Sequence, residues 1–171
     1  MRFQYCPLCG GRLVDKKIPD EGLVPYCVPC GRVYFQQPLP CVLALAVNAG
    51  GEVALLHQHE VAETHDVVVA GHLLSGENGE EAAAREVREE LGLAVLSSCY
   101  VGSYYFPQKD MLMLGYAVQV EGDAFILSEE VDAAVWLPAN LALNRLREGG
   151  PAYCLLRDYM NNRKNMDSNE Q

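Results

Sequence analysis

The segment Gly71–Leu93 constrains the fold most, because it joins a clear helix signal to a dense cluster of charge. Its sequence, GHLLSGENGEEAAAREVREELGL, contains six glutamates. The part from Glu80 to Leu91 is rich in alanine and glutamate, has no proline and is followed by Gly92, which predicts a helix ending at that glycine. Helical periodicity places side chains of two kinds on different faces: the acidic Glu86, Glu89 and Glu90, and the apolar Ala84, Val87 and Leu91.

The acidic face of this helix has two interpretations. A solvated acidic surface is the ordinary explanation for a glutamate-rich helix. Like charges one turn apart destabilise a helix, however, and Arg85 and Arg88 are expected to relieve that repulsion only in part. A divalent cation, Mg²⁺ or Mn²⁺, would relieve it, because both ions prefer carboxylate oxygens. The pattern therefore favours a metal site that binds a phosphate group and activates water.

The rest of the chain alternates apolar runs with turn signals. CVLALAVNAGGEVALLHQH predicts a β-hairpin, and HDVVVAGHLL, CYVGSYYFP, DMLMLGYAVQVEG and AAVWLPA predict further strands. A second helical pattern runs from Leu141 to Asn161 with an interruption at EGGPA, and a polar tail follows. Strands mixed with two main helices predict an α/β or α+β domain.

Length and composition exclude several classes of protein. The 171 residues suffice for one core and a small appendage. The longest clean apolar run is 42–47, far short of the roughly 20 residues that span a membrane. No apolar signal region precedes the first cysteines, so we expect a cytoplasmic protein without a membrane partner. The net charge of −10 argues against broad nucleic-acid binding.

Two C-x2-C pairs, CPLCG and CVPCG, lie in residues 1–36. Each pair is followed by a glycine, which lets the backbone fold beneath the two sulfurs. Two disulfides or four unremarkable thiols are alternatives, but four thiolates so spaced suit a closed structural Zn²⁺ site. A segment this short cannot bury a core, so a metal would stabilise it. The predicted ligands are Cys6, Cys9, Cys27 and Cys30.

The remaining cysteines stand in apolar contexts. Cys41, Cys99 and Cys154 lie in PCVLALAV, SSCYVG and AYCLLRDY. We expect all three to be buried structural thiols rather than reactive ones.

The segment Gly71–Leu93 also fits a known family pattern at every fixed position. It resembles the Nudix box, G-x5-E-x7-R-E-U-x-E-E-x-G-U, where U is a bulky aliphatic residue. The resemblance implies an α/β/α sandwich with a mixed β-sheet, the box forming a loop, a helix and a loop beneath the substrate. We therefore expect a zinc ribbon over 1–36, a Nudix hydrolase domain over 37–161 and a polar tail over 162–171. The implied reaction is metal-dependent hydrolysis of a nucleoside diphosphate derivative.

The resemblance assigns metal-binding roles within and beside the box. Glu86 and Glu90 are implied as the principal ligands of Mg²⁺ or Mn²⁺, and the backbone carbonyl of Ala70 as a further one. Glu89 is implied either as a ligand or as the base that deprotonates water. Glu130, in LSEEVDAAVW, resembles a downstream metal-binding glutamate, with an exposed loop acid as the alternative.

Two box residues have an implied structural role. Arg85 and Glu77 are expected to pair and to brace the loop against the helix.

A four-cysteine segment ahead of the box resembles the NADH pyrophosphatase group of this family. VYFQQPLPCVLALAV is similar to a segment of that group that supplies a base-contacting aromatic residue, and VGSYYFPQKD keeps half of its later signature, S-Q-P-W-P-F-P-Q-S. His72 stands where the group usually has phenylalanine. The implied substrate-binding residues are Phe35, His72, Tyr104, Tyr105 and Phe106, and structural roles remain an alternative for the histidine and the two tyrosines.

Two classes of function stay open. The resemblance implies a homodimeric enzyme that cleaves NADH or NAD⁺ to AMP and nicotinamide mononucleotide, with ADP-ribose or a nucleotide sugar as the alternative substrate. The other class is a non-catalytic module that senses a nucleotide while its ribbon contacts nucleic acid or protein. Such a module would be free to lose box glutamates, and this chain has lost none. The ribbon also has few basic residues for capturing nucleic acid.

Overall fold

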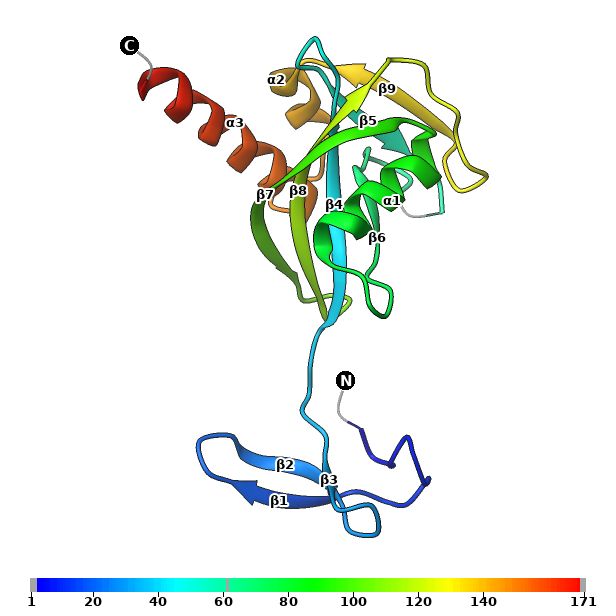
Figure 1. The fold of residues 1–171 in the computed structure, drawn as a ribbon, viewed down its shortest axis with the longest axis vertical. Coiled ribbons are helices and arrows are strands. Elements are labelled where there is room, and N and C mark those ends of the chain that lie inside the picture. Colours follow the sequence, from blue (N-terminus) through cyan, green and yellow to red (C-terminus); the bar gives the residue numbers. More distant parts are fainter. Residues whose placement is uncertain (1–2, 61, 170–171) are drawn as a thin grey trace. The chain divides into compact units, whose positions relative to one another are not determined.

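The computed structural model of the chain describes residues 3–60 and 62–169. It divides into two compact units, Met1–Pro38 and Leu39–Gln171 (Figure 1). None of the helices in the described part of the chain has the length and apolar character needed to cross a membrane.

The N-terminal unit is a small antiparallel sheet of three strands, β1 (Val14–Ile18), β2 (Gly22–Cys27) and β3 (Arg32–Val33). One cysteine pair precedes β1 and the other connects β2 to β3. In each pair the trailing glycine donates its N–H to the carbonyl of the first cysteine, Gly10 to Cys6 at 2.8 Å and Gly31 to Cys27 at 2.9 Å. Both glycines have positive φ, so the predicted turns depend on residues without a Cβ.

The C-terminal unit is built on one mixed sheet. Its strands are β4 (Leu39–Val47), β5 (Val53–His57), β6 (Val69–His72), β7 (Ala94–Phe106), β8 (Met111–Glu121) and β9 (Ala133–Leu137). The order is β7-β8-β4-β5-β9, and β6 pairs with β4. The central pair β4–β8 is parallel, whereas the other pairs are antiparallel. The predicted hairpin corresponds to β4 and β5.

Helices cover both faces of this sheet. Helix α1 (Gly79–Leu91) packs on one face, while α2 (Ala139–Ala142), the 3₁₀ helix η1 (Leu143–Arg145) and α3 (Pro151–Asn169) lie on the other. Strand β4 is therefore buried on both sides, which explains its unbroken apolar sequence. Val42, Ala44 and Ala46 face α1, and Leu43, Leu45 and Val47 face the other core. The predicted α/β/α sandwich is confirmed.

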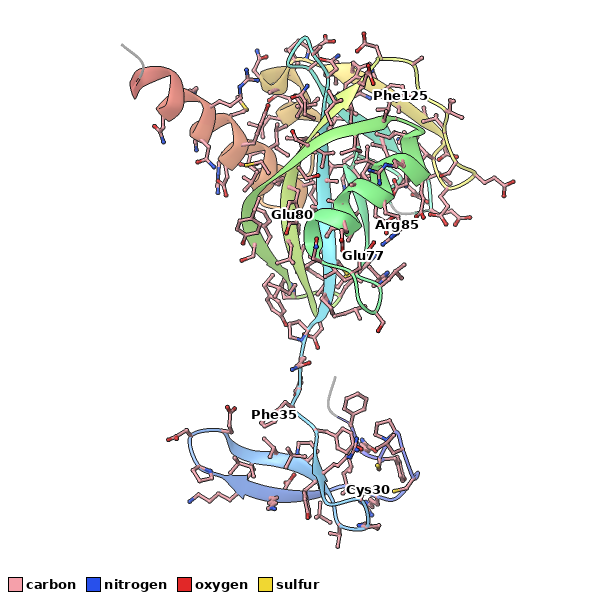
Figure 2. All side chains as sticks on the ribbon, viewed as in Figure 1. Cys30, Phe35, Glu77, Glu80, Arg85 and Phe125 are labelled. Atoms are coloured by element: carbon pink, nitrogen blue, oxygen red, sulfur yellow. The ribbon has the colours of Figure 1, made fainter. Side chains whose placement is uncertain are left out.

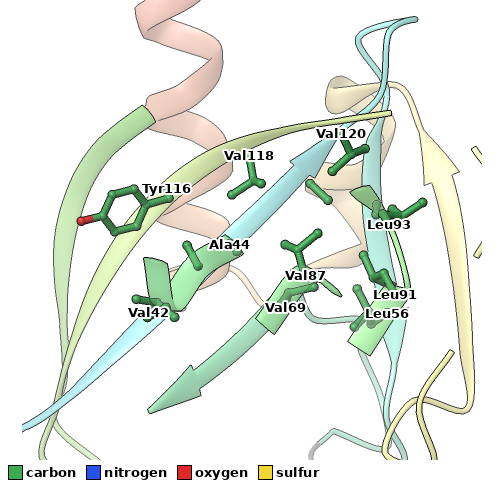
Figure 3. Close-up of a cluster of buried hydrophobic side chains, with 14 of the residues drawn as sticks. Val42, Ala44, Leu56, Val69, Val87, Leu91, Leu93, Tyr116, Val118 and Val120 are labelled. Atoms are coloured by element: carbon green, nitrogen blue, oxygen red, sulfur yellow. The ribbon is translucent and has the colours of Figure 1, made fainter. Parts of the chain in front are cut away.

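The core beneath α1 fixes the orientation of that helix. Val87 and Leu91 are fully buried and meet Val42, Leu56 and Val69 from the sheet (Figure 3). Complete burial of such side chains contributes about 1.5–3 kcal/mol each. Because the apolar face is held in this way, the acidic face lies beside the core, against strand β6.

Local sequence signals mark both ends of the box helix, but they do not mark the end of α3. The box helix begins at Gly79 with a capping box, in which the Asn78 side chain accepts from the Glu81 N–H and the Glu81 carboxylate accepts from the Asn78 N–H. It ends at Gly92 in the left-handed conformation, as predicted. Helix α3 instead continues to Asn169, eight residues beyond the predicted helical pattern that ended at Asn161. Positions 170–171 lie outside the described residues.

Burial of the three isolated cysteines also differs from expectation. Cys41 is buried, but Cys99 is exposed and Cys154 is partly exposed. Cys99 lies in β7, an edge strand of the sheet, which pairs with β8 alone among the described strands. An apolar sequence context cannot distinguish an edge strand from a central one.

Candidate metal and catalytic site

Helix α1 presents its three box glutamates at different depths. Glu90 is buried, with a relative exposure of 5%. The side chain of Glu86 is largely buried, whereas that of Glu89 is 59% exposed. Within the predicted arc, the exposure of the side chain therefore increases from the buried Glu90 to the exposed Glu89.

Strand β6 runs close against this face. A Cβ atom at Gly71 would overlap the carboxylate of Glu86 and would displace it from its present position. On the next residue back, the N–H of Ala70 donates to Oε1 of Glu90 at 3.4 Å. The first glycine of the box thus makes room for a carboxylate against the main chain.

Gln58, directly after β5, is a member of the site that the sequence interpretation missed. Its Nε2 donates to Oε2 of Glu90 at 3.3 Å. Strand alternation could have placed it on the α1 side, since Leu56 belongs to that core. Nothing in the residue type pointed to a glutamate 32 positions away.

Arg85 connects the loop of the box to the helix. Its Nε and Nη2 donate to the two carboxylate oxygens of Glu77 at 2.8 and 3.0 Å, and Nη2 also donates to the carbonyl of His72 at 3.0 Å. The two charged side chains lie together beside α1 in Figure 2. This bidentate pair lowers the pKa of Glu77 through its hydrogen bonds to the guanidinium.

The same guanidinium also reaches the metal-binding face. Nη1 of Arg85 donates to Glu86 at 2.7 Å and to Glu89 at 3.0 Å. Arg85 therefore reduces the charge repulsion between these two glutamates more than the sequence predicted. This effect does not extend to Glu90, whose hydrogen-bond donors in the described part of the chain are the neutral Gln58 and Ala70.

The electrostatics of Glu90 fit a bound cation. Burial, together with the charges of Glu86 and Glu130, raises the pKa of its carboxyl group to about 7. A buried carboxylate with only neutral donors is costly when ionised, and a divalent cation removes that cost. Because the ligand atoms on offer are carboxylate oxygens, the donor set fits Mg²⁺ or Mn²⁺.

Glu130 approaches the box from the connection between β8 and β9. It is exposed, and its charge acts on Glu90. The connection is held to the end of α1 by two backbone hydrogen bonds, from Ile126 to Leu91 and from Ser128 to Glu90.

The cysteines of the N-terminal unit form one cluster. The four sulfur atoms all lie within 4.8 Å of one another, and all four residues are free thiols: Cys6, Cys9, Cys27 and Cys30. Hydrogen bonding to Cys9 and Cys27 raises the pKa of Cys30 to about 12, and a bound cation would favour the thiolate of this residue. Tyr34, which the sequence interpretation did not include, places its Oη 3.0 Å from the sulfur of Cys6. The arrangement fits one tetrahedral metal ion.

The four predicted substrate-binding residues of the C-terminal unit differ in their burial and in their partners. Tyr104 packs in the α3-side core and its hydroxyl donates to Asp158 at 3.1 Å, while Tyr105 is exposed and donates to Asp110 at 2.9 Å. Phe106 packs against the same core as Tyr104. His72 is exposed at the end of β6.

The strand register sets the spacing between two of these residues. His72 pairs with Cys41, Cys41 with Met113, and Met113 with Tyr104. Three interstrand steps of about 4.8 Å separate His72 from Tyr104 by roughly 14 Å. Phe35 belongs to the N-terminal unit, where it lines a hollow of about 460 Å³ with Leu23 and Pro25 among others.

The family profile described as NUDIX domain matches residues 37–159. The chain belongs to the Nudix family. Among solved structures, a NUDIX hydrolase from Nitrosomonas europaea has a TM-score of 0.72 at 19% identity and covers 95% of this chain and 93% of its own. That likeness supports the fold, and it extends over both units of the chain.

Curated Nudix relatives carry a more specific name. The NAD-capped RNA hydrolase NudC of Pseudomonas aeruginosa (strain LESB58) is 32% identical over 134 residues, which is 78% of this chain and 47% of that protein. The NAD-capped RNA hydrolase NudC of Escherichia coli O9:H4 (strain HS) is 29% identical over 161 residues, 88% of this chain and 61% of that protein. The chain thus spans about half of the length of the curated relatives it matches.

Proposed function

We propose that this protein is a metal-dependent pyrophosphohydrolase of a nicotinamide dinucleotide, NADH or NAD⁺, and that it releases AMP and nicotinamide mononucleotide. The observation that carries the reaction class is Glu90, a buried carboxylate with neutral hydrogen-bond donors beside Glu86. The choice of dinucleotide is supported by relatives named for hydrolysis of NAD-capped RNA. The NAD cap of an RNA presents the same pyrophosphate.

Glu86, Glu90, Glu130 and the carbonyl of Ala70 would hold Mg²⁺ or Mn²⁺. When bound, such an ion binds phosphate oxygens and lowers the pKa of water. The exposed Glu89 is positioned to accept the proton of the attacking water, and Arg85 orients it through a 3.0 Å hydrogen bond. The water oxygen bonds to one phosphorus, the bond from that phosphorus to the bridging oxygen breaks, and two monophosphates leave.

Two further roles complete the proposal. Cys6, Cys9, Cys27 and Cys30 would hold one structural Zn²⁺ that keeps the N-terminal unit folded. Phe35, His72, Tyr105 and Phe106 would contact the bases of the substrate, and the chain would act as a homodimer.

A second substrate class has its own supporting observation. A dinucleotide needs a flat apolar surface for each of its two bases, whereas Tyr104 is committed to the core and to Asp158. ADP-ribose or a nucleotide sugar needs only one such surface. Either would be cleaved by the same carboxylates.

The experiment is a comparison of substrates with Mg²⁺ and Mn²⁺, reading mononucleotide release from NADH, NAD⁺, ADP-ribose, a nucleotide sugar and an NAD-capped oligoribonucleotide. We expect fastest release from a nicotinamide substrate, and loss of release in Glu89→Gln. Faster turnover of ADP-ribose or the sugar would replace the dinucleotide by the second class. Release from none of them, by zinc-loaded protein with either ion, would contradict the enzymatic assignment.

A further inference from the structure

The connection Gly122–Asp132, between β8 and β9, is fastened to the C-terminal end of the box helix (Figure 1). The N–H of Ile126 donates to the carbonyl of Leu91 at 2.9 Å, and that of Ser128 donates to the carbonyl of Glu90 at 3.2 Å. Both carbonyls belong to the last turn of α1, whose acceptors have no partner inside the helix. The connection therefore serves as the cap of the helix that carries the box glutamates.

Gly92 makes this contact possible. A Cβ at this position would lie 2.6 Å from the Cβ of Ile126 and 2.8 Å from its carbonyl oxygen. The glycine also adopts φ of 67°, which disfavours any other residue. The second glycine of the box is thus needed twice, to end the helix and to admit the connection.

A pair of aromatic rings anchors the connection to the sheet. Phe125 stacks on Trp136 of β9 with ring centroids 5.0 Å apart and an interplanar angle of 21°. The indole N–H donates to the carbonyl of Asp123 at 2.8 Å. Both rings pack at the margin of the α1-side core, and Phe125 is labelled in Figure 2. Such a pair contributes about 0.5–1.5 kcal/mol beyond its buried area.

The other end of the connection is fixed as well. Val131 is buried in the α1-side core, and the N–H of Asp132 donates to the carbonyl of His57 at 3.0 Å. Glu130 lies between these anchors with its side chain exposed. No hydrogen bond joins its carboxylate to another described residue, although its charge acts on Glu90. Its place relative to α1 is therefore set by the anchored connection and not by a hydrogen bond of its own side chain.

We propose that Phe125 and Trp136 are positioning residues for the metal site, because their stack holds the connection that places Glu130 beside Glu86 and Glu90. The inference rests on the proposed function in taking Glu130 as a metal ligand. It adds that the affinity for the catalytic cation depends on an aromatic pair that touches no metal.

The test measures binding of Mn²⁺ to the full-length, zinc-loaded chain through the electron paramagnetic resonance signal of free Mn²⁺. The variants are Phe125→Ala, Trp136→Phe, Glu130→Gln and the double variant Phe125→Ala/Glu130→Gln. Leu127→Ala is the matched control, because it removes an apolar side chain from the same connection but outside the stack. Circular dichroism shows which variants are folded, and Trp136→Phe retains a ring if Phe125→Ala fails to fold.

We expect Phe125→Ala to weaken Mn²⁺ binding about tenfold, as loss of an outer support of a ligand commonly does. Trp136→Phe should weaken it less, and Leu127→Ala should leave it unchanged. In the Glu130→Gln background the Phe125 substitution should change the affinity for Mn²⁺ by less than about twofold, because the ligand through which Phe125 acts has already been removed.

The outcomes separate this inference from the proposed function. Wild-type protein that binds no Mn²⁺, or Glu130→Gln that binds it normally, would remove the ligand role of Glu130 and the inference with it. Weaker binding in Glu130→Gln with normal binding in folded Phe125→Ala would leave the proposed function intact and overturn the inference alone. Equal weakening by Phe125→Ala in both backgrounds would also overturn it.

Discussion

The four-cysteine cluster and the carboxylate site solve the same electrostatic problem in different ways. In both, side chains that can carry a negative charge lie close together. The cysteine cluster is closed, with a sulfur from each residue within 4.8 Å of the others and little apolar core around it. The carboxylate site lies on a helix backed by a large core, is open at Glu89 and is partly neutralised by Arg85. We propose that the cysteine cluster needs a metal ion in order to fold, whereas the carboxylate site folds first and needs a metal ion for catalysis.

The largest expected effect concerns the cysteine cluster. Replacing Cys27 by Ser should release the zinc and unfold the N-terminal unit, because structural zinc binding contributes on the order of 10 kcal/mol in small domains. Elemental analysis should find one zinc per wild-type chain and less in the variant. Far-UV circular dichroism of the variant should retain the signal of the C-terminal unit. A variant that keeps both its zinc and its structure would contradict the division between the two sites.

The carboxylate site should show the reverse behaviour. Glu89→Gln and Glu90→Gln should each lower kcat by about 100-fold or more, since a base or a metal ligand is lost, while the fold stays intact. Initial rates at saturating Mg²⁺ measure this loss, and Glu80→Gln, outside the acidic arc, is the matched control. Near-normal rates in either variant would exclude that glutamate from the mechanism.

Glu90 also predicts how stability depends on pH without the catalytic cation. Burial raises its pKa from 4.5 to about 7, so its stabilising contribution is present below pH 4.5 and is lost as pH rises through 7. Between pH 5 and 8, wild-type protein should lose up to about 3 kcal/mol of unfolding free energy relative to Glu90→Gln. Denaturant unfolding of zinc-loaded, Mg²⁺-free protein at both pH values measures the difference. If the unfolding free energy changed equally with pH in the two proteins, the raised pKa of Glu90 in the metal-free state would be contradicted.

The smallest expected effect tests whether the N-terminal unit only supports the fold. Phe35→Ala should raise KM for NADH about fivefold or more without lowering kcat in proportion, as loss of one stacked base does. Leu23→Ala, which alters the same hollow without removing an aromatic ring, is the control. An unchanged KM in Phe35→Ala would restrict substrate recognition to the C-terminal unit.

Features of the site that depend on neighbouring residues in the chain could be predicted from the sequence. Helical periodicity separated Val87 from Glu90, and glycine at 92 marked the end of the helix, because both effects act over one or two turns. The two cysteine pairs predicted the cluster, since each turn is formed by its own residues.

Features that depend on tertiary packing could not be predicted in this way. The bond from Gln58 to Glu90 and the stack of Phe125 on Trp136 join segments that only the folded sheet brings together. Exposure of Cys99 required knowing that β7 is an edge strand. The further hydrogen bonds of Arg85 depend on where the loop before the helix returns, which the box pattern alone does not state.

The parallel pairing of β4 with β8 has a consequence for the order in which the chain folds. Leu39 pairs with Met111, so the centre of the sheet joins segments that the whole box separates. Such non-local pairing is slow, because a long loop must close before any contact rewards it. During synthesis the cysteine unit is complete once Tyr34 has left the ribosome, whereas α1 has no finished sheet to pack on until β8 has emerged. In a nascent chain stalled between these points, the four-cysteine cluster would therefore already be able to form, while the glutamate-rich segment would still be exposed to chaperones and proteases.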